Sequence, residues 1–160
     1  MAYITKIGII GPKPFVLNGH DIDNTLRKSV REKMKEIIKE VQDDNTVVVG
    51  YTGLDLGSQQ DFALACIDMG IDYHCVSPFE NLRQSLFGIS EILPLYDELI
   101  DRALSVTYLS EGFYSPKKTF TYENYILKNC DIVIFVRNGI RKEYSFNNDK
   151  VITIDMQPIF

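Results

Sequence analysis

Two segments of the chain join a short β-branched apolar run to glycines and then to polar residues. They are Ile7-Gly8-Ile9-Ile10-Gly11-Pro12-Lys13 and Val47-Val48-Val49-Gly50-Tyr51-Thr52-Gly53-Leu54-Asp55-Leu56-Gly57. An open α/β sheet uses such strand-to-loop-to-helix junctions to build a pocket for a phosphate or a nucleotide at the carboxyl ends of its strands. Binding of a small molecule is therefore the first hypothesis.

The glycines in these segments would let backbone N–H groups approach a ligand closely. A helix that begins after Asp55 would point its unpaired N–H groups and positive dipole end at an anion, and Lys13 could contact a phosphate. The alternative is that Gly50 and Gly53 are only turn residues, Asp55 only a helix cap and Lys13 a solvated surface residue. Two such loops on adjacent strands would open onto one crevice, which favours binding.

Neither loop carries a named phosphate fingerprint. The second lacks the GxGxxG spacing of dinucleotide-binding folds, and the chain contains no GxxxxGK[ST] string. Four aromatic residues in or beside loops could stack on a base, although aromatic residues at such positions more often cover the edge of the core: Tyr51, Phe79, Tyr114 and Tyr122.

Carboxylates offer a route to hydrolysis. Asp55, Glu80 and Glu111 are expected at or beyond the ends of strands, where an acid could stabilise the oxocarbenium-like transition state of N-glycosidic cleavage. We favour the alternative, in which Asp55 caps a helix and both glutamates are solvated, because no paired acid motif is present. The chain has only two histidines, His20 and His74, which argues against a Ser-His-Asp triad or a histidine-rich metal site.

Length and composition indicate one domain, residues 1–160, that is large enough to bury a core. The net charge of −5 and the absence of a basic run argue against binding to duplex nucleic acid, although a local basic pocket stays open. The chain lacks an apolar stretch of the roughly 20 residues that span a bilayer, and its N-terminus does not resemble a signal peptide. We therefore expect a cytoplasmic protein.

Three cysteines, Cys66, Cys75 and Cys130, lie inside apolar patterns without CxxC spacing. This placement is typical of small buried hydrophobic residues in a reducing compartment rather than of a disulfide or a metal site. No metal or other cofactor is expected.

Hydrophobic periodicity predicts strands that alternate with helices. The expected strands are residues 4–10, 46–49, 71–76, 106–109 and 131–136, and the expected helices are residues 22–41, from after Asp55 to Met69, from about Pro94 to Ala103, and 121–128. We expect Asp21 or Asp23 to cap the first helix, Asp55 the second, and Gly70 to close the second. The alternation predicts a single Rossmann-like α/β domain with a doubly wound, mainly parallel sheet.

The end of the chain breaks this alternation. Asn138-Gly139 lies between apolar runs, and Asn147-Asn148-Asp149 precedes the apolar run 151–154. Because Asn-Gly is a strong hairpin signal, the sequence predicts a closing β-hairpin or meander at the edge of the sheet.

Beyond these patterns, the order of several motifs resembles the YpsA-like family of the SLOG superfamily, whose Rossmann-like relatives include DprA and LOG-type proteins. The matching motifs are Ile9-Ile10-Gly11-Pro12-Lys13-Pro14, Gly50-Tyr51-Thr52-Gly53-Leu54-Asp55-Leu56, Ser77-Pro78-Phe79-Glu80, Tyr96, Ser110 with Tyr114-Ser115-Pro116, and Asn124 through Phe135. The resemblance covers roughly residues 4–136 and implies a pocket for a nucleotide or a nucleotide derivative.

The chain departs from these relatives at two places. The phosphoribohydrolase relatives carry a PGGxGTxxE loop that is absent here, so their activity is not carried over. After the last clear strand, the family has a further glycine-containing loop and a helix, where this chain has Asn138-Gly139. Part of the usual phosphate site is therefore expected to be missing.

The first reading is a homo-oligomeric domain that binds a nucleotide or an ADP-ribose-like molecule. Its expected binding residues are Gly11, Pro12, Lys13, Gly50, Tyr51, Thr52, Gly53, Asp55, Pro78, Phe79, Glu80 and Asn124. In this reading Gly53→Asp abolishes binding and leaves the fold intact. The second reading is an N-glycosidase or deoxyribosyltransferase-like enzyme that uses Asp55 or Glu80. The third is an interaction protein with a vestigial pocket, whose closing strands offer an edge to a partner.

Overall fold

The sequence folds around one parallel sheet, as the computed structural model of the chain shows for residues 3–11, 21–86, 92–138 and 150–156. The predicted Rossmann-like α/β fold is confirmed, and the six strands follow the order β4-β3-β2-β1-β5-β6. In chain order the elements are β1 (Tyr3–Ile10), α1 (Thr25–Val41), β2 (Thr46–Thr52), α2 (Ser58–Asp68), β3 (Asp72–Ser77), α3 (Leu82–Ser85), α4 (Leu93–Arg102), β4 (Val106–Tyr108), α5 (Pro116–Asn129), β5 (Ile132–Asn138) and β6 (Val151–Met156).

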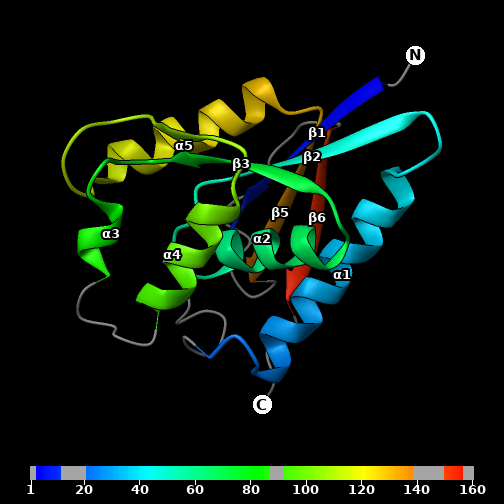
Figure 1. Cartoon of the computed structure of the whole chain (residues 1–160), viewed down its shortest axis with the longest axis horizontal. Coiled ribbons are helices and arrows are strands. Elements are labelled where there is room, and N and C mark those ends of the chain that lie inside the picture. Colours follow the sequence, from blue (N-terminus) through cyan, green and yellow to red (C-terminus); the bar gives the residue numbers. More distant parts are fainter. Residues whose placement is uncertain (1–2, 12–20, 87–91, 139–149, 157–160) are drawn as a thin grey trace.

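Helices cover both faces of the sheet. α1, α2 and α4 pack on one face, and α5 packs on the other (Figure 1). The chain moves in one direction from β1 to β4 and then returns to place β5 beside β1. Because right-handed crossovers are the rule, this reversal requires α5 to lie on the opposite face.

The reversal also creates a switch point at β1. β1 pairs in parallel with β2 on one side and with β5 on the other. Connections that leave neighbouring strands toward opposite faces open a crevice beyond their carboxyl ends, which is where open α/β sheets bind ligands. The carboxyl end of β1 is Ile10, followed by Gly11.

Two hydrophobic clusters hold these layers together. The larger joins the stripe of α1 to α2, α4 and the sheet, and includes Met34, Ile38 and Phe62, none of which is exposed. The smaller lies under α5 and centres on Tyr122, Ile126 and Cys130. Ile126 and Cys130 pack so closely on Gly8 that a Cβ atom there would collide with both side chains. Gly8 therefore permits α5 to approach β1.

The cap of α1 differs from the prediction. Asn24 is the N-cap, and its side chain accepts a hydrogen bond from the N–H of Arg27 at 2.9 Å. Asp21 instead accepts from the N–H of Asp23 at 2.9 Å in the preceding turn. Asp and Asn are both good caps, so the sequence alone left the starting residue open within this cluster.

The cap of α2 is also corrected. The helix begins at Ser58, with Gly57 as its N-cap, and Asp55 lies in the loop before it. Gly57 has φ 92°, a conformation that glycine adopts readily. At the other end, Gly70 has φ 67° and closes the helix as predicted.

Two other boundaries differ in ways that affect the site. β2 continues through Thr52, so Gly50 lies inside a strand and not in a loop. α5 begins at Pro116, several residues before the predicted start at Thr121, which places Thr119 in its first turns. Proline suits this position because its missing N–H would have no partner in the first turn of a helix.

The C-terminal strand is at the edge of the sheet, as predicted, but its direction is not that of a hairpin. β6 pairs in parallel with β5, from Val133 opposite Val151 to Asn138 opposite Met156. An antiparallel hairpin or meander of these two strands is therefore wrong. The Asn-Gly signal describes only local turn geometry, whereas the length of chain between the two strands permits a parallel return. Residues 139–149 lie outside the described residues.

All three cysteines are buried, as predicted from the apolar patterns around them, and each is a free thiol in the structure. His74 lies half-buried on β3, where its Nδ1 is 2.7 Å from the hydroxyl of Ser105 and its ring packs against Tyr51. Across the described ranges, no helix is long and apolar enough to span a membrane.

Candidate functional site

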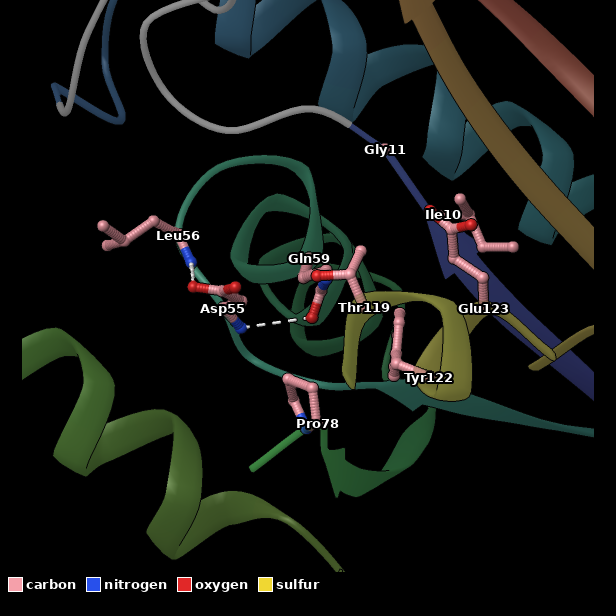
Figure 2. Close-up of a pocket in the computed structure, with 9 residues that line it drawn as sticks. All are labelled: Ile10, Gly11, Asp55, Leu56, Gln59, Pro78, Thr119, Tyr122 and Glu123. Atoms are coloured by element: carbon pink, nitrogen blue, oxygen red, sulfur yellow. Dashed lines mark hydrogen bonds between the residues drawn. The ribbon is translucent and has the colours of Figure 1, made fainter. Parts of the chain in front are cut away.

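A cleft opens at the carboxyl ends of β1, β2 and β3, beside the first half of α5 (Figure 2). Its lining residues come from four separate parts of the chain: Ile10, Gly11, Asp55, Leu56, Gln59, Pro78, Thr119, Tyr122 and Glu123. The cavity volume is about 50 Å³, room for only a few water molecules. The cleft therefore suits one part of a small molecule rather than a whole nucleotide.

Side chains fix the loop between β2 and α2, which forms one wall. Thr52 is fully buried, and its hydroxyl accepts from the N–H of Leu54 at 3.2 Å and donates to the carbonyl of Gln59 at 2.8 Å. Leu54 has φ 57°, a left-handed conformation that costs a residue with a side chain about 1–2 kcal/mol. The buried side chain of Leu54 and the Thr52 bond offset this strain. The side chains of the loop itself thus hold it in one conformation.

The polar groups of this wall face the cleft from Asp55 and Gln59. The Gln59 side-chain oxygen accepts from the N–H of Asp55 at 3.2 Å, and Oδ1 of Asp55 accepts from the N–H of Leu56 at 2.8 Å (Figure 2). Asp55 is half-buried. These bonds hold its carboxylate in one orientation at the edge of the cleft.

Tyr122 connects the elements that form the floor of the cleft. Its hydroxyl donates to the carbonyl of Ile9 at 2.7 Å and accepts from the N–H of Gly53 at 3.3 Å, so one side chain of α5 joins β1 and the end of β2. Burial raises the pKa of the Tyr122 phenol well above its ordinary value of 10.0. Tyr122 is therefore a neutral structural group at physiological pH.

Glu123 faces the same cleft from α5, opposite the loop that carries Asp55 (Figure 2). It is half-buried, and desolvation raises the pKa of its carboxyl above 4.5. Within the described part of the chain, this carboxyl makes no hydrogen bond or ion pair. The sequence analysis missed Glu123. The signal available was the four-residue spacing of Tyr122 and Ile126, which sets the buried face of α5 and places residue 123 at its margin.

A buried ion cluster lies behind the loop, between α1 and α2. Arg27 is 1% exposed, and its Nε lies 3.0 Å from Oδ2 of the fully buried Asp61, while Nη1 of Arg31 lies 2.9 Å from Oδ1. Arg27 also donates to the carbonyl of Gly57 at 3.3 Å. Desolvation raises the pKa of Asp61, and the two guanidinium groups oppose that shift. The cluster thus anchors the turn that starts α2, and sequence reasoning gave no sign of it.

Three of the predicted site residues line the cleft: Gly11, Asp55 and Pro78. Thr52 and Gly53 lie behind its wall, where they shape the loop. A Cβ atom on Gly11 would collide with the Ser58 hydroxyl, so this glycine is required for the close approach of β1 to α2.

The other predicted residues lie elsewhere. Gly50 packs against Cys66 and Phe62, and the ring of Tyr51 packs on His74. Phe79 is 3% exposed and belongs to the core, whereas Glu80 and Asn124 are exposed and do not line the cleft. Pro12 and Lys13 lie outside the described residues.

The described residues bring together no group of three His, Cys, Asp or Glu side chains that could hold a metal ion. Burial also raises the pKa of the Cys75 and Cys130 thiols to about 12, so neither supplies a thiolate near neutral pH. Among the described residues that line the cleft, the carboxyl groups are those of Asp55 and Glu123.

Comparison with known proteins gives no match, either to a family model or to a curated protein.

Proposed function

We propose that the chain binds a nucleotide or a nucleotide-derived small molecule in the cleft at the carboxyl ends of β1–β3. The observation that carries this proposal is the convergence of three adjacent parallel strands and α5 on one polar-lined cleft beside the switch point of the sheet. This is the position at which open α/β sheets take ligands. Membership of the YpsA-like family is part of the same proposal, and rests on the order of the motifs described above.

The start of α2 offers a place for an anionic group. In the described ranges, the first turn of α2 has no side-chain cap, and the helix has 11 residues. Its N–H groups and dipole would favour a phosphate at the side of the cleft near Gly57. Behind this turn, the buried guanidinium groups of Arg27 and Arg31 both contact the carboxylate of Asp61.

A thermal-shift panel of nucleoside mono-, di- and triphosphates, ADP-ribose, NAD and cyclic nucleotides tests the proposal on the full chain. A ligand at a hundred times its dissociation constant should stabilise the protein by about 2.7 kcal/mol, a shift of a few degrees. Asp55→Asn should weaken that shift, and Asp72→Asn, an exposed change on β3, should not. A panel without any shift would contradict binding and favour the interaction-protein reading.

Two carboxyls in one cleft support a second candidate, hydrolysis of an N-glycosidic bond. In such a reaction the C1′–N bond breaks, water adds its oxygen to C1′, and the departing base receives a proton. Asp55 with Glu123, rather than Glu80, would supply the two carboxyls. Release of free base from nucleoside monophosphates, lost in Glu123→Gln and kept in Glu80→Gln, would establish it. Binding of a nucleotide without release of free base would support the first proposal and contradict hydrolysis.

We also propose a homo-oligomer through β4. This edge strand exposes Val106 and Tyr108, with Leu104 exposed just before it, and its three residues include neither a charge nor a proline. Edge strands without such protection pair with other strands. Light scattering should find a dimer for the native chain and a monomer for Tyr108→Lys. A native chain that is monomeric at high concentration would contradict this interface.

A further inference from the structure

The charges of the cleft restrict which part of a ligand it can accept. Among its nine described lining residues, Asp55 and Glu123 carry carboxyl groups, and the phenol of Tyr122 is neutral at physiological pH. None of these nine described residues is a lysine, an arginine or a histidine. The carboxyl of Glu123 therefore has no cation beside it among the described lining residues, and it is negative at neutral pH.

A phosphate would be repelled by this carboxylate. A phosphate monoester carries about −1.5 to −2 charges at pH 7, and in a partly desolvated site its repulsion by a neighbouring carboxylate is stronger than in bulk water. We therefore expect the part of a nucleotide that lies against Glu123 to be neutral. Under the proposed function, the phosphate lies at the start of α2, on the other side of the loop.

The Glu123 carboxyl suits a ligand that donates hydrogen bonds, such as one with hydroxyl groups. An ionised carboxyl only accepts hydrogen bonds, and that of Glu123 has no partner within the described residues. Thr119 lies one helical turn before Glu123, on the same side of α5, and also lines the cleft. On the opposite wall, the side-chain oxygen of Gln59 is already engaged by Asp55, which leaves its amide as a donor.

Apolar side chains complete the surface around these groups. Ile10, Leu56 and Pro78 line the same cleft. A compact ring that carries adjacent hydroxyls matches this combination of acceptors, apolar contacts and small volume. In a nucleotide, that ring is the ribose.

We propose that Glu123, with Asp55 across the cleft, accepts hydrogen bonds from the 2′- and 3′-hydroxyls of a ribose and so selects ribonucleotides over 2′-deoxyribonucleotides. This inference rests on the proposed function and names the part of the ligand that the cleft holds. A carboxylate that accepts from a ribose 2′-hydroxyl is a recognised solution in dinucleotide-binding folds. Here the acceptor comes from α5 rather than from the end of a strand.

The test is calorimetric titration of the full chain with the four ribonucleoside 5′-monophosphates, their 2′-deoxy counterparts, ribose 5-phosphate and inorganic phosphate. We expect each ribonucleotide that binds to bind at least about tenfold more tightly than its deoxy counterpart, the value of one hydrogen bond to a charged group. Glu123→Gln should bring that ratio close to one. The matched control Glu36→Gln, on the exposed face of α1, should leave the ratio unchanged.

The outcomes distinguish a failure of ribose selection from a failure of the proposed nucleotide binding. Equal affinity for ribo and deoxy ligands, or an undiminished ratio in Glu123→Gln, overturns ribose selection and leaves nucleotide binding standing. Absence of binding by every phosphate-containing probe, in this titration and in the thermal-shift panel, overturns both. The comparison of ligand pairs on the native chain needs no variant, so it decides the question even if a substitution impairs folding.

Discussion

The hydroxyl of Tyr122 accepts a hydrogen bond from the N–H of Gly53 at 3.3 Å, across the floor of the cleft. The same hydroxyl donates to the carbonyl of Ile9 at 2.7 Å. One phenol therefore fixes the distance between α5 and two strand ends. Since Tyr122 is 2% exposed, water cannot take over these bonds if the hydroxyl is lost.

Tyr122→Phe should therefore lower the free energy of unfolding by about 1–3 kcal/mol, because a buried N–H and a buried carbonyl lose their partner. Urea denaturation measures this loss. Tyr3→Phe, at an exposed position, is the matched control and should change little. Equal denaturation midpoints for the two variants would contradict the proposed floor of the cleft.

The buried ion cluster predicts a larger loss. Asp61→Asn removes the only carboxylate that is paired with both Arg27 and Arg31 in the described structure, and leaves two buried positive charges. We expect a loss of about 3–5 kcal/mol. Asp68→Asn, seven residues later on the same helix, breaks only an exposed pair with Lys35 and should cost no more than about 1 kcal/mol. Similar losses from both variants would show that the buried cluster is not important for stability.

Glu123 should reduce the stability of the folded protein at neutral pH. Desolvation raises its folded-state pKa above 4.5, so its ionised form is favoured in the unfolded chain. The resulting penalty is present above the folded-state pKa, diminishes as the pH falls through it, and is absent below the unfolded-state pKa.

Glu123→Gln is therefore expected to be more stable than the native chain at pH 7, with a gain that shrinks toward pH 4.5 and vanishes below it. Urea denaturation of both proteins at several pH values measures the difference between their free energies of unfolding. Glu36→Gln should show no such trend. A Glu123→Gln variant that is less stable than the native chain at pH 7 would contradict a destabilising Glu123 carboxylate. A difference in stability that does not change with pH would contradict it as well.

Gly53→Asp is a poor binding test, contrary to the expectation from sequence. A Cβ atom on Gly53 would collide with the Gln59 side-chain oxygen and lie 3.1 Å from both Pro78 and Tyr122. The new carboxylate would also be buried, so we expect a loss of roughly 3 kcal/mol or more. Gly70→Asp, at an exposed glycine with nothing within 4 Å, should cost much less. Thermal denaturation compares the two, and equal melting temperatures would contradict the crowding.

Much of the fold follows from local patterns. The continuous apolar run of β5 and the stripe of α1 each identify one element, and their alternation predicts the parallel sheet. The direction of β6 could not be predicted from local patterns. The Asn138-Gly139 pair indicates a turn, whereas the direction of a strand depends on how the chain returns to the sheet. A single sequence carries no signal for that return.

The cleft was predicted only in part. Strand ends could be located, so Gly11, Asp55 and Pro78 were named in advance. Asn124 was named in place of Glu123, because which residue of α5 faces the cleft depends on the rotation of the helix, and that is set by tertiary packing of Tyr122 and Ile126. The ion pair of Arg27 with Asp61 joins two different helices. Residues so far apart in the sequence form no local pattern from which their contact could be predicted.

The most direct test of the central claim is to map ligand contacts by amide chemical-shift changes in the ¹⁵N-labelled chain, which at 18.3 kDa is suited to such spectra. Ribose 5-phosphate and the best-binding nucleotide of the panel are the probes. We expect changes concentrated at the loop that includes Gly53 and Asp55, at Gln59, and around Thr119 and Glu123 on α5. Saturating ligand that leaves these amides unchanged, or that shifts only residues at the β4 edge, would contradict the claim that this cleft is the binding site.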